Sequence, residues 1–202
     1  MWRISPHLPS HSSTGLPWLY LGNWESGEHF PRIFFHRMIP FTFHSEHNSL
    51  VSDSFIDAVL KAHNELRLHH NVPCLKWSSA LSKDAQAWAE KLSRNDELRH
   101  ARKEERNFKG ENICRMSDHY DVADAVRIWY SEVNSYKYDS PGFSHDTGHF
   151  TQIVWRETSE VGVGTCKSRD GRLTYLVARY HPAGNVLKRF NENVLPSSSS
   201  SI

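Results

Sequence analysis

The spacing of the hydrophobic residues changes along this sequence, and the change restricts the chain to a fold that combines helices with an antiparallel sheet. In three segments between residues 53 and 136, hydrophobic residues recur every three or four positions, whereas between residues 161 and 177 they alternate with other residues. The first spacing is that of an amphipathic helix and the second that of a strand. We therefore expect an α+β protein.

The first two helical segments each have a visible end. The first begins near Asp53 and is stopped by Asn71 and Pro73, because proline does not continue a helix. The second follows Trp77, with Ser78 or Ser79 as its N-cap. Its apolar residues lie four, three and four positions apart: Leu81, Ala85, Trp88 and Leu92. These spacings predict two amphipathic helices.

A third helix is predicted from about Asp121 to Tyr136. Its apolar residues repeat the same spacing: Val122, Val126, Trp129 and Val133. Residues 94–110 between the second and third helices are polar and of mixed charge. We therefore expect them to form an exposed connection.

The C-terminal part of the sequence predicts a β-hairpin. Val161, Val163 and Thr165 alternate with other residues, and so do Leu173, Tyr175 and Val177. Between the two runs, Asp170 and Gly171 supply a tight turn. Residues 150–155 fit a short helix or a strand equally well by their pattern.

The two ends of the chain differ from the middle. Residues 1–52 mix Pro, Ser, His and aromatic residues without a period, so we expect a disordered or loosely packed extension. Residues 196–202 form a Ser-rich tail too polar to pack, which leaves residues 53–195 as the domain. The extension shows no signal-peptide core or membrane span. Trp2 also takes the place of the glycine that N-myristoylation requires.

Charge and cysteine content exclude some classes of protein. The chain has 24 Lys and Arg against 23 Asp and Glu, a net charge of +1, which argues against a nucleic-acid partner. Its three cysteines, Cys74, Cys114 and Cys166, are an odd number without CxxC spacing. We expect reduced thiols, with one disulfide as the alternative.

Two stretches resemble the signatures of the CAP family, which includes the cysteine-rich secretory and pathogenesis-related proteins. Residues 148–158, GHFTQIVWRET, resemble the first signature and contain Gly148, Phe150, Thr151, Gln152 and Trp155. Residues 175–185, YLVARYHPAGN, resemble the second and contain Tyr180, Pro182, Gly184 and Asn185. Ala178 stands where secreted members carry a disulfide cysteine. The resemblance is strongest to the cysteine-poor, short, Golgi-associated pathogenesis-related type.

The resemblance implies a fold and a site. The fold is a three-layer α-β-α sandwich around a central, mostly antiparallel sheet, with residues 150–155 in a helix. The site is a cleft that holds a tetrad of His100, Glu111, Glu132 and His149. Two neutral imidazoles suit a borderline-soft divalent metal, and nearby carboxylates orient them, so His100 and His149 are the candidate ligands for Zn²⁺.

Two members of the tetrad have independent support. Glu132 lies three residues after Trp129, on the flank of the apolar stripe of the third predicted helix, where a carboxylate needs a partner. His149 follows Gly148, which has no side chain and lets a backbone or ligand come close.

The resemblance favours a non-enzymatic binding module that associates with itself and with membrane lipids. The alternative is a metal-assisted hydrolase of ester or peptide bonds that uses Glu111 and Glu132, although no HExxH motif is present. A third reading is an interaction domain with an empty cleft. We expect an intracellular protein, peripheral at Golgi membranes, with an extracellular location as the alternative.

The remaining candidate residues have simpler roles. Ser117 and Cys114 lack the context of a nucleophile. His63 is expected in the core, and four further histidines are expected in solvent: His69, His70, His119 and His145. Three aromatic residues near the cleft are expected to be half-buried, with a hydrophobic ligand as the alternative: Tyr136, Tyr138 and Phe143.

Overall fold

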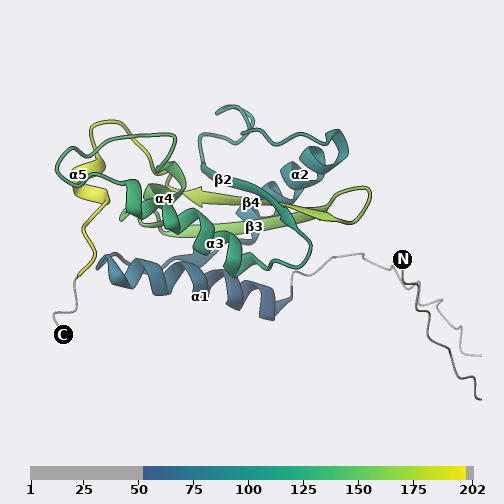
Figure 1. Cartoon of the computed structure of the whole chain (residues 1–202), viewed down its shortest axis with the longest axis horizontal. Helices are drawn as coiled ribbons and strands as arrows, with labels where there is room; N and C mark the ends of the chain where they lie inside the picture. The colour runs from purple at the N-terminus through teal and green to yellow at the C-terminus, as the bar shows by residue number, and fades with distance from the viewer. Residues whose placement is uncertain (1–51, 199–202) are drawn as a thin grey trace, which may run out of the picture. The chain divides into compact units, whose positions relative to one another are not determined.

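The structure is a computed structural model that describes residues 52–198, which lie within one compact unit. The predicted extension up to residue 51 and the last part of the Ser-rich tail, residues 199–202, lie outside the described residues. The elements follow in this order: α1 (Asp53–His69), β1 (Lys76–Trp77), α2 (Ser79–Asn95), β2 (Gly110–Ser117), α3 (Val122–Tyr130), the 3₁₀ helix η1 (Ser131–Ser135), α4 (Gly148–Ile153), β3 (Glu160–Lys167), β4 (Leu173–His181) and α5 (Phe190–Asn193) (Figure 1).

The four strands form one open sheet in the order β1-β3-β4-β2. The β3–β4 and β4–β2 pairs are antiparallel, and only the short β1 runs parallel to β3. The predicted hairpin is confirmed, with Glu160 opposite His181 and Lys167 opposite Thr174. Gly171 has a φ of 72° in the turn, a conformation that glycine adopts without strain.

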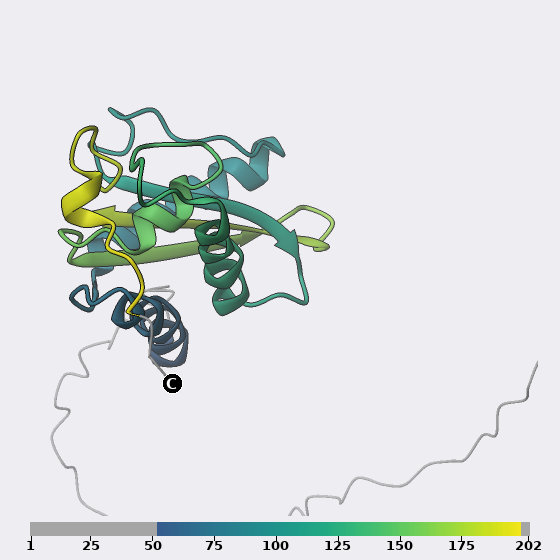
Figure 2. The same cartoon turned by 60° about the vertical axis from the view of Figure 1, so that its left-hand side comes forward.

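Helices cover both faces of the sheet. Figure 2 shows α2 on one side and α1 with α3 on the other. Along β4, Tyr175 and Val177 pack into the core beneath α2, whereas Leu176, Ala178 and Tyr180 pack into the core beneath α1 and α3. Both faces of the strand are therefore buried, as in other sheets enclosed by helices. The predicted three-layer α-β-α sandwich is confirmed.

Two glycines let α2 lie close to the backbone of β3. A Cβ atom on Gly162 would lie 2.1 Å from the backbone nitrogen of Ser82, and one on Gly164 would lie 2.2 Å from that of Gln86. The Ser82 hydroxyl uses this closeness to donate a hydrogen bond of 2.9 Å to the carbonyl of Val163. Any side chain at either glycine would push the helix off the sheet.

Strand β2 has no counterpart in the sequence prediction. It contains Glu111, Asn112 and Arg115, so its residue pattern does not predict a buried strand. Its first four residues are nevertheless buried, because the polar side chains Glu111 and Asn112 find partners elsewhere in the fold. The tertiary structure outweighs the sequence pattern here.

The helices begin close to where the sequence predicts. The Ser52 side chain caps α1 by accepting from the amide of Phe55 at 3.2 Å, and Asp121 and Asp124 form a reciprocal capping box at α3. The third helix is shorter than predicted, because the chain tightens into the 3₁₀ helix η1 after Tyr130. Residues 148–153 are a helix, as the resemblance implied.

One histidine prediction is wrong. His70 was expected in solvent, but it is fully buried. Its Nδ1–H donates to the carbonyl of Leu195 at 2.7 Å, and its Nε2 accepts from the hydroxyl of Tyr130 at 2.9 Å. These partners come from distant parts of the chain, so local spacing does not reveal them. The described part of the tail, residues 196–198, is exposed, and the amide of Ser198 donates to the carbonyl of His69 at 2.8 Å.

The three cysteines are unpaired in the structure. Cys74 is exposed, whereas burial raises the pKa of Cys114 to about 12. A thiol with a raised pKa carries little thiolate, so Cys114 is an inert packing residue. Among the described residues, none of the helices combines the length and the apolarity needed to cross a membrane.

Candidate functional site

The structure brings the predicted tetrad together from four separate elements. His100 lies in the connection after α2, Glu111 in β2, Glu132 in η1 and His149 in α4. Each histidine is paired with one glutamate at 2.6 Å, and the ring centres of the two histidines lie 6.4 Å apart. The four side chains therefore form two His–carboxylate pairs side by side.

The first pair is anchored by a fully buried carboxylate. Glu111 Oε1 accepts from Nδ1–H of His100 at 2.6 Å and from the amide of Ala101 at 3.0 Å, and its Oε2 accepts from the guanidinium of Arg179. Burial alone would raise the pKa of Glu111, but the hydrogen bond from His100 and the charge of Arg179 outweigh it and lower that pKa. Glu111 is therefore held as a carboxylate.

Arg179 is the site residue that the sequence reading missed. It is 1% exposed, lies directly across from Glu111 in the β2–β4 ladder, and donates through Nε to Asp84 at 3.1 Å. A charged residue in the middle of a buried strand needs an opposite charge. That rule would have marked Arg179, but its partner was hidden because β2 was not predicted.

The second pair joins η1 to the start of α4. Glu132 Oε1 accepts from Nδ1–H of His149, and its Oε2 accepts from the backbone amides of His149 at 2.9 Å and Phe150 at 3.1 Å. The His149 ring also stacks on Trp129, with ring centres 5.8 Å apart and an angle of 20° between the planes. This geometry supplies the partner that the position of Glu132 led us to expect.

The hydrogen bonds fix which ring nitrogen of each histidine is available. A carboxylate only accepts, so Nδ1 carries the proton in both His100 and His149. In a neutral ring, Nε2 then keeps its lone pair. Among residues 52–198, no hydrogen-bond partner occupies either Nε2 atom. Each ring thus offers one free ligand nitrogen, oriented by a carboxylate.

The donor set suits a metal with few protein ligands. A Zn–N bond is about 2 Å long and the ring centre lies about 1 Å beyond the nitrogen, so two rings on one ion have centres up to about 6 Å apart. The observed 6.4 Å between His100 and His149 exceeds that limit. No group of three or more His, Cys, Asp or Glu side chains poised for a metal occurs in the described part of the chain. The two rings would have to move slightly together to share one ion.

Three members of the tetrad, His100, Glu111 and His149, line a cleft of about 720 Å³. Several signature residues build its floor by tying neighbouring segments together. Gln152 accepts from the amide of Gly184 at 2.9 Å, and Asn185 donates to the carbonyl of Gly148 at 2.8 Å. The Thr151 hydroxyl donates to the Asn185 side chain at 2.5 Å. The floor is therefore rigid, and most of its own polar groups are already satisfied.

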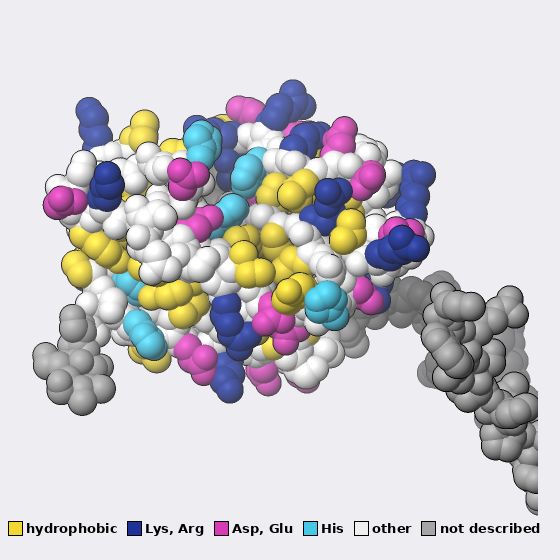
Figure 3. Space-filling view, viewed as in Figure 1, with side chains coloured by type: hydrophobic (Ala, Val, Ile, Leu, Met, Phe, Trp, Pro, Cys, Tyr) yellow, Lys and Arg dark blue, Asp and Glu magenta, His cyan; other side chains and the backbone are white. Residues whose placement is uncertain are grey.

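The other signature residues lie in the core or beside the cleft. Phe150, Trp155 and Tyr180 are fully buried, and the carbonyl of Pro182 accepts from Thr158 at 2.9 Å. Of the three aromatic residues expected near the cleft, only Phe143 lines it, whereas Tyr136 and Tyr138 pack edge to face with ring centres 4.8 Å apart. In the upper half of Figure 3, His side chains reach the surface beside Lys, Arg and hydrophobic side chains.

An α-β-α sandwich with two His–Glu pairs at an open cleft defines a CAP-type domain. Residues 60–180 match the sequence model described as "CAP: Cysteine-rich secretory protein family". The chain therefore belongs to the CAP family.

Known relatives agree with this assignment. The chain is 43% identical over 147 residues to human Golgi-associated plant pathogenesis-related protein 1, covering 72% of this chain and 95% of the relative. It is 38% identical over 145 residues to Protein PRY2 of Saccharomyces cerevisiae, covering 70% of this chain and 41% of that protein. Among solved structures, BmVAL-1 superposes with a TM-score of 0.61 at 22% identity, covering 75% of this chain and 87% of that one. NaASP2, solved with Zn²⁺, gives 0.57 at 21% identity, covering 73% and 87%.

Proposed function

We propose that this protein is a non-enzymatic CAP-domain binding module whose cleft holds a divalent metal ion, Zn²⁺, between His100 and His149. The observation that carries the proposal is the arrangement of the two His–carboxylate pairs. Each carboxylate orients one ring and leaves its Nε2 without a hydrogen-bond partner among the described residues, and the two ring centres lie 6.4 Å apart. A carboxylate that hydrogen-bonds to a metal-binding histidine raises the affinity of that histidine for the metal.

A relative supports the choice of zinc. NaASP2, which shares the fold, has been crystallised with Zn²⁺. Two histidines leave the other coordination positions to water or to a ligand in the cleft. We therefore expect the zinc ion to bind weakly and to exchange with solvent, unlike the ion of a closed structural site.

The charges around the tetrad also limit zinc affinity. The Glu111 carboxylate is already neutralised by the buried guanidinium of Arg179. Only Glu132 adds an uncompensated negative charge next to the ion, since its partners are His149 and backbone amides. The site therefore attracts a dication less strongly than two free carboxylates would.

The same carboxylates argue against the hydrolase alternative. A general base needs a free lone pair within reach of a substrate or water. Glu111 already accepts from His100, Ala101 and Arg179. Glu132 accepts from three donors as well. Most of the acceptor sites of each carboxylate are therefore already occupied, which favours the binding module.

The proposal includes a location and partners. The human relative is named as Golgi-associated, and we place this protein at Golgi membranes as a peripheral, self-associating module that contacts lipids. Light scattering on the purified full chain measures self-association, and flotation with anionic or zwitterionic vesicles measures lipid contact. A strictly monomeric protein that stays unbound to both kinds of vesicle would remove this part of the proposal.

Calorimetric titration of Zn²⁺ into the chelator-stripped protein tests the metal site. We expect saturable binding of one ion per chain that is lost in His100→Ala/His149→Ala. The matched control is His69→Ala/His119→Ala, which removes two exposed histidines and is expected to bind like the wild type. Equal Zn²⁺ binding in both double variants would contradict a metal site in the cleft. The remaining interpretation would then be an interaction domain whose cleft holds no metal.

A further inference from the structure

A buried series of hydrogen bonds connects α1 to the second His–Glu pair. It runs through His63 on α1, Tyr180 on β4 and Asn112 on β2, each of which is 1% exposed or less. We refer to these three residues as the buried relay. His63 Nε2 lies 2.9 Å from the hydroxyl of Tyr180, which lies 3.3 Å from Nδ2 of Asn112. The same Nδ2 donates to the backbone carbonyl of His149 at 3.1 Å. The relay therefore ends on a residue of the tetrad.

Every donor in the relay has a fixed direction while His63 is neutral. The Nδ1–H of His63 donates to the carbonyl of Val59 at 2.8 Å, because a carbonyl only accepts. Its Nε2 must then accept from the hydroxyl of Tyr180. The Tyr180 oxygen in turn accepts one N–H of Asn112, whose other N–H goes to the carbonyl of His149. No donor of the neutral relay is left over.

One acceptor, however, is left over. Asn112 Oδ1 is buried and has no hydrogen-bond partner in the described part of the chain. A buried polar atom without a partner costs free energy, so its presence needs an explanation. The two ends of an asparagine amide have nearly the same shape, so turning the amide over exchanges Oδ1 and Nδ2 within the same space. The relay therefore has a second arrangement, in which Oδ1 faces Tyr180.

A proton on His63 favours that second arrangement. Both ring nitrogens then donate, so the Tyr180 oxygen must accept from Nε2 and its own O–H needs a new acceptor. Asn112 Oδ1 supplies the acceptor once the amide has turned over. The turn also takes the N–H away from the carbonyl of His149 and puts Oδ1 in its place, where two acceptor oxygens repel each other. His149 thus loses a hydrogen bond when His63 gains a proton.

The surroundings of His63 keep it neutral until the solution is acidic. Burial is the largest cause and lowers the pKa of His63 to about 4; the hydrogen bond to Val59 opposes this shift, and the charge of Arg67 on α1 adds to it. From β4 the ring faces Tyr180, and from β2 Cys114 lies close enough to act on that tyrosine. No carboxylate among residues 52–198 forms an ion pair with His63. The relay therefore rearranges only in acid.

We propose that the buried relay is an acid-sensitive switch for the cleft, in which a proton on His63 turns the Asn112 amide and withdraws a hydrogen bond from His149. The second His–Glu pair is thereby loosened, and the cleft loses part of its preorganisation. The inference rests on the proposed binding-module function, because it regulates the same site. Linkage also requires the converse: whatever binds at His149 and needs the first arrangement makes His63 harder to protonate.

An NMR titration of the isotope-labelled full-length protein from pH 7.5 to pH 3.5, with excess chelator present, tests the switch. It follows the ring of His63, the side-chain amide of Asn112 and the carbonyl carbon of His149. We expect the three signals to share one transition with its midpoint near pH 4. Across it, the protection of the α4 amides against hydrogen exchange is expected to fall about tenfold, because one hydrogen bond is lost.

Two variants interrupt the relay. Tyr180→Phe removes the hydroxyl in its middle, so the transition of His63 should no longer reach the carbonyl of His149. A transition caused by Glu132, which also bonds to His149, would survive in this variant. His63→Gln keeps a donor and an acceptor but takes up no proton, so the transition should disappear from Asn112 and His149. Circular dichroism at each pH confirms that the variants are folded.

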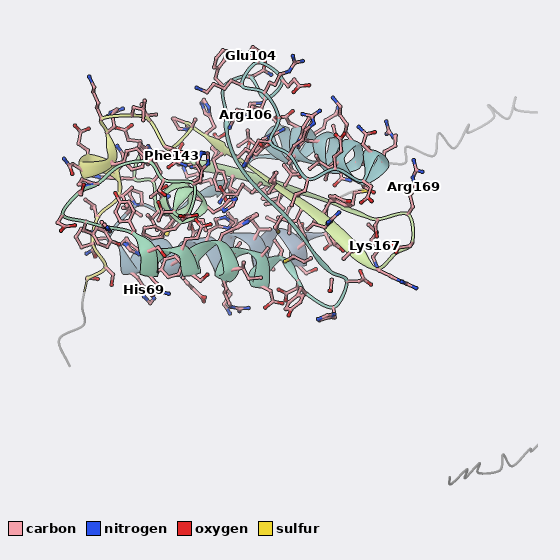
Figure 4. All side chains as sticks on the ribbon, turned by 45° about the horizontal axis from the view of Figure 1, so that its top comes forward. His69, Glu104, Arg106, Phe143, Lys167 and Arg169 are labelled. Carbon is pink, nitrogen blue, oxygen red and sulfur yellow. The ribbon has the colours of Figure 1, made fainter. Side chains whose placement is uncertain are left out.

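Two control variants change similar groups outside the relay. Tyr130→Phe removes the hydroxyl that donates to the other buried histidine at this end of α1, His70, at 2.9 Å. His69→Gln removes an exposed histidine at the C-terminal end of the same helix, labelled at the lower edge of the molecule in Figure 4. Both are expected to keep the shared transition, because neither group belongs to the relay.

The outcomes that overturn the switch are distinct from failure of the metal site. Different midpoints for His63 and Asn112, or a transition at His149 that Tyr180→Phe leaves unchanged, would overturn it. So would cooperative unfolding of the wild type before His63 takes up its proton, because no folded protonated state would then exist. Since chelator is present throughout, loss of Zn²⁺ binding with an intact shared transition removes only the metal site. Intact Zn²⁺ binding without the shared transition removes only the switch.

Discussion

Acid is expected to destabilise this protein through His63, a fully buried histidine on α1. Its Nδ1–H donates to the carbonyl of Val59 at 2.8 Å, since a carbonyl only accepts. Its Nε2 therefore accepts from the hydroxyl of Tyr180 at 2.9 Å. Burial, aided by the charge of Arg67 and only partly offset by the Val59 hydrogen bond, lowers the pKa of His63 to about 4.

The lowered pKa sets both the sign and the pH range of the effect. In the unfolded chain, His63 takes up its proton near its ordinary value of 6.5, whereas the folded protein resists protonation until about pH 4. Stability is therefore complete above pH 6.5 and falls as the pH drops, by about 1.4 kcal/mol per unit. The full loss by pH 4 is about 3 kcal/mol, a large share of the 5–15 kcal/mol typical of a domain.

Urea unfolding followed by tryptophan fluorescence at pH 7.5 and pH 5 measures this loss. His63 is expected to remove about 2 kcal/mol from the wild-type free energy of unfolding between these pH values. Buried His70, whose pKa is also lowered by burial, acts in the same direction, so the test compares variants. His63→Gln should be less stable at pH 7.5 but lose about 2 kcal/mol less on acidification.

The control is His69→Gln, at the exposed end of the same helix, which should keep the wild-type pH dependence. If His63→Gln lost as much stability as the wild type between pH 7.5 and pH 5, the reasoning from burial would be refuted.

Three further changes test other parts of the structure. Glu132→Gln should weaken Zn²⁺ binding about 10–100-fold in calorimetry, because the ring is no longer oriented by a charged partner; unchanged affinity would contradict that role. Arg179→Leu should cost about 3–5 kcal/mol in urea unfolding, since it leaves Glu111 buried without an opposite charge; a loss under about 1 kcal/mol would contradict this. Gly162→Ala should cost about 3 kcal/mol through a clash with α2, whereas Gly142→Ala, with open space around it, should change stability by less than about 0.5 kcal/mol.

Much of the fold could be predicted because the spacing of hydrophobic residues within each helix and strand is a local property of the sequence. The spacing of Leu81, Ala85 and Trp88 sets the buried face of α2 in any environment. The turn at Asp170 and Gly171 likewise fixes the β3–β4 hairpin through its own backbone preferences. The signature at residues 148–158 then identified the family, which supplied the order of the layers.

The tetrad shows where prediction from sequence stops. The resemblance to the family pointed to His100, Glu111, Glu132 and His149 as separate positions. Only the structure shows each ring bonded through Nδ1 to one carboxylate, with the second pair beside the first. That geometry depends on the packing of β2, η1 and α4, which no single segment encodes.

The sequence by itself determined the amphipathic helices, the hairpin and the family, because each of these depends on residues near one another in the chain. The tertiary structure alone decided that polar strand β2 is buried, that Arg179 balances Glu111, and that His70 leaves solvent. A buried polar or charged group is stable only when its partner is present, and these partners lie up to 125 positions away. The local sequence pattern does not indicate such distant partners, so only the folded structure shows them.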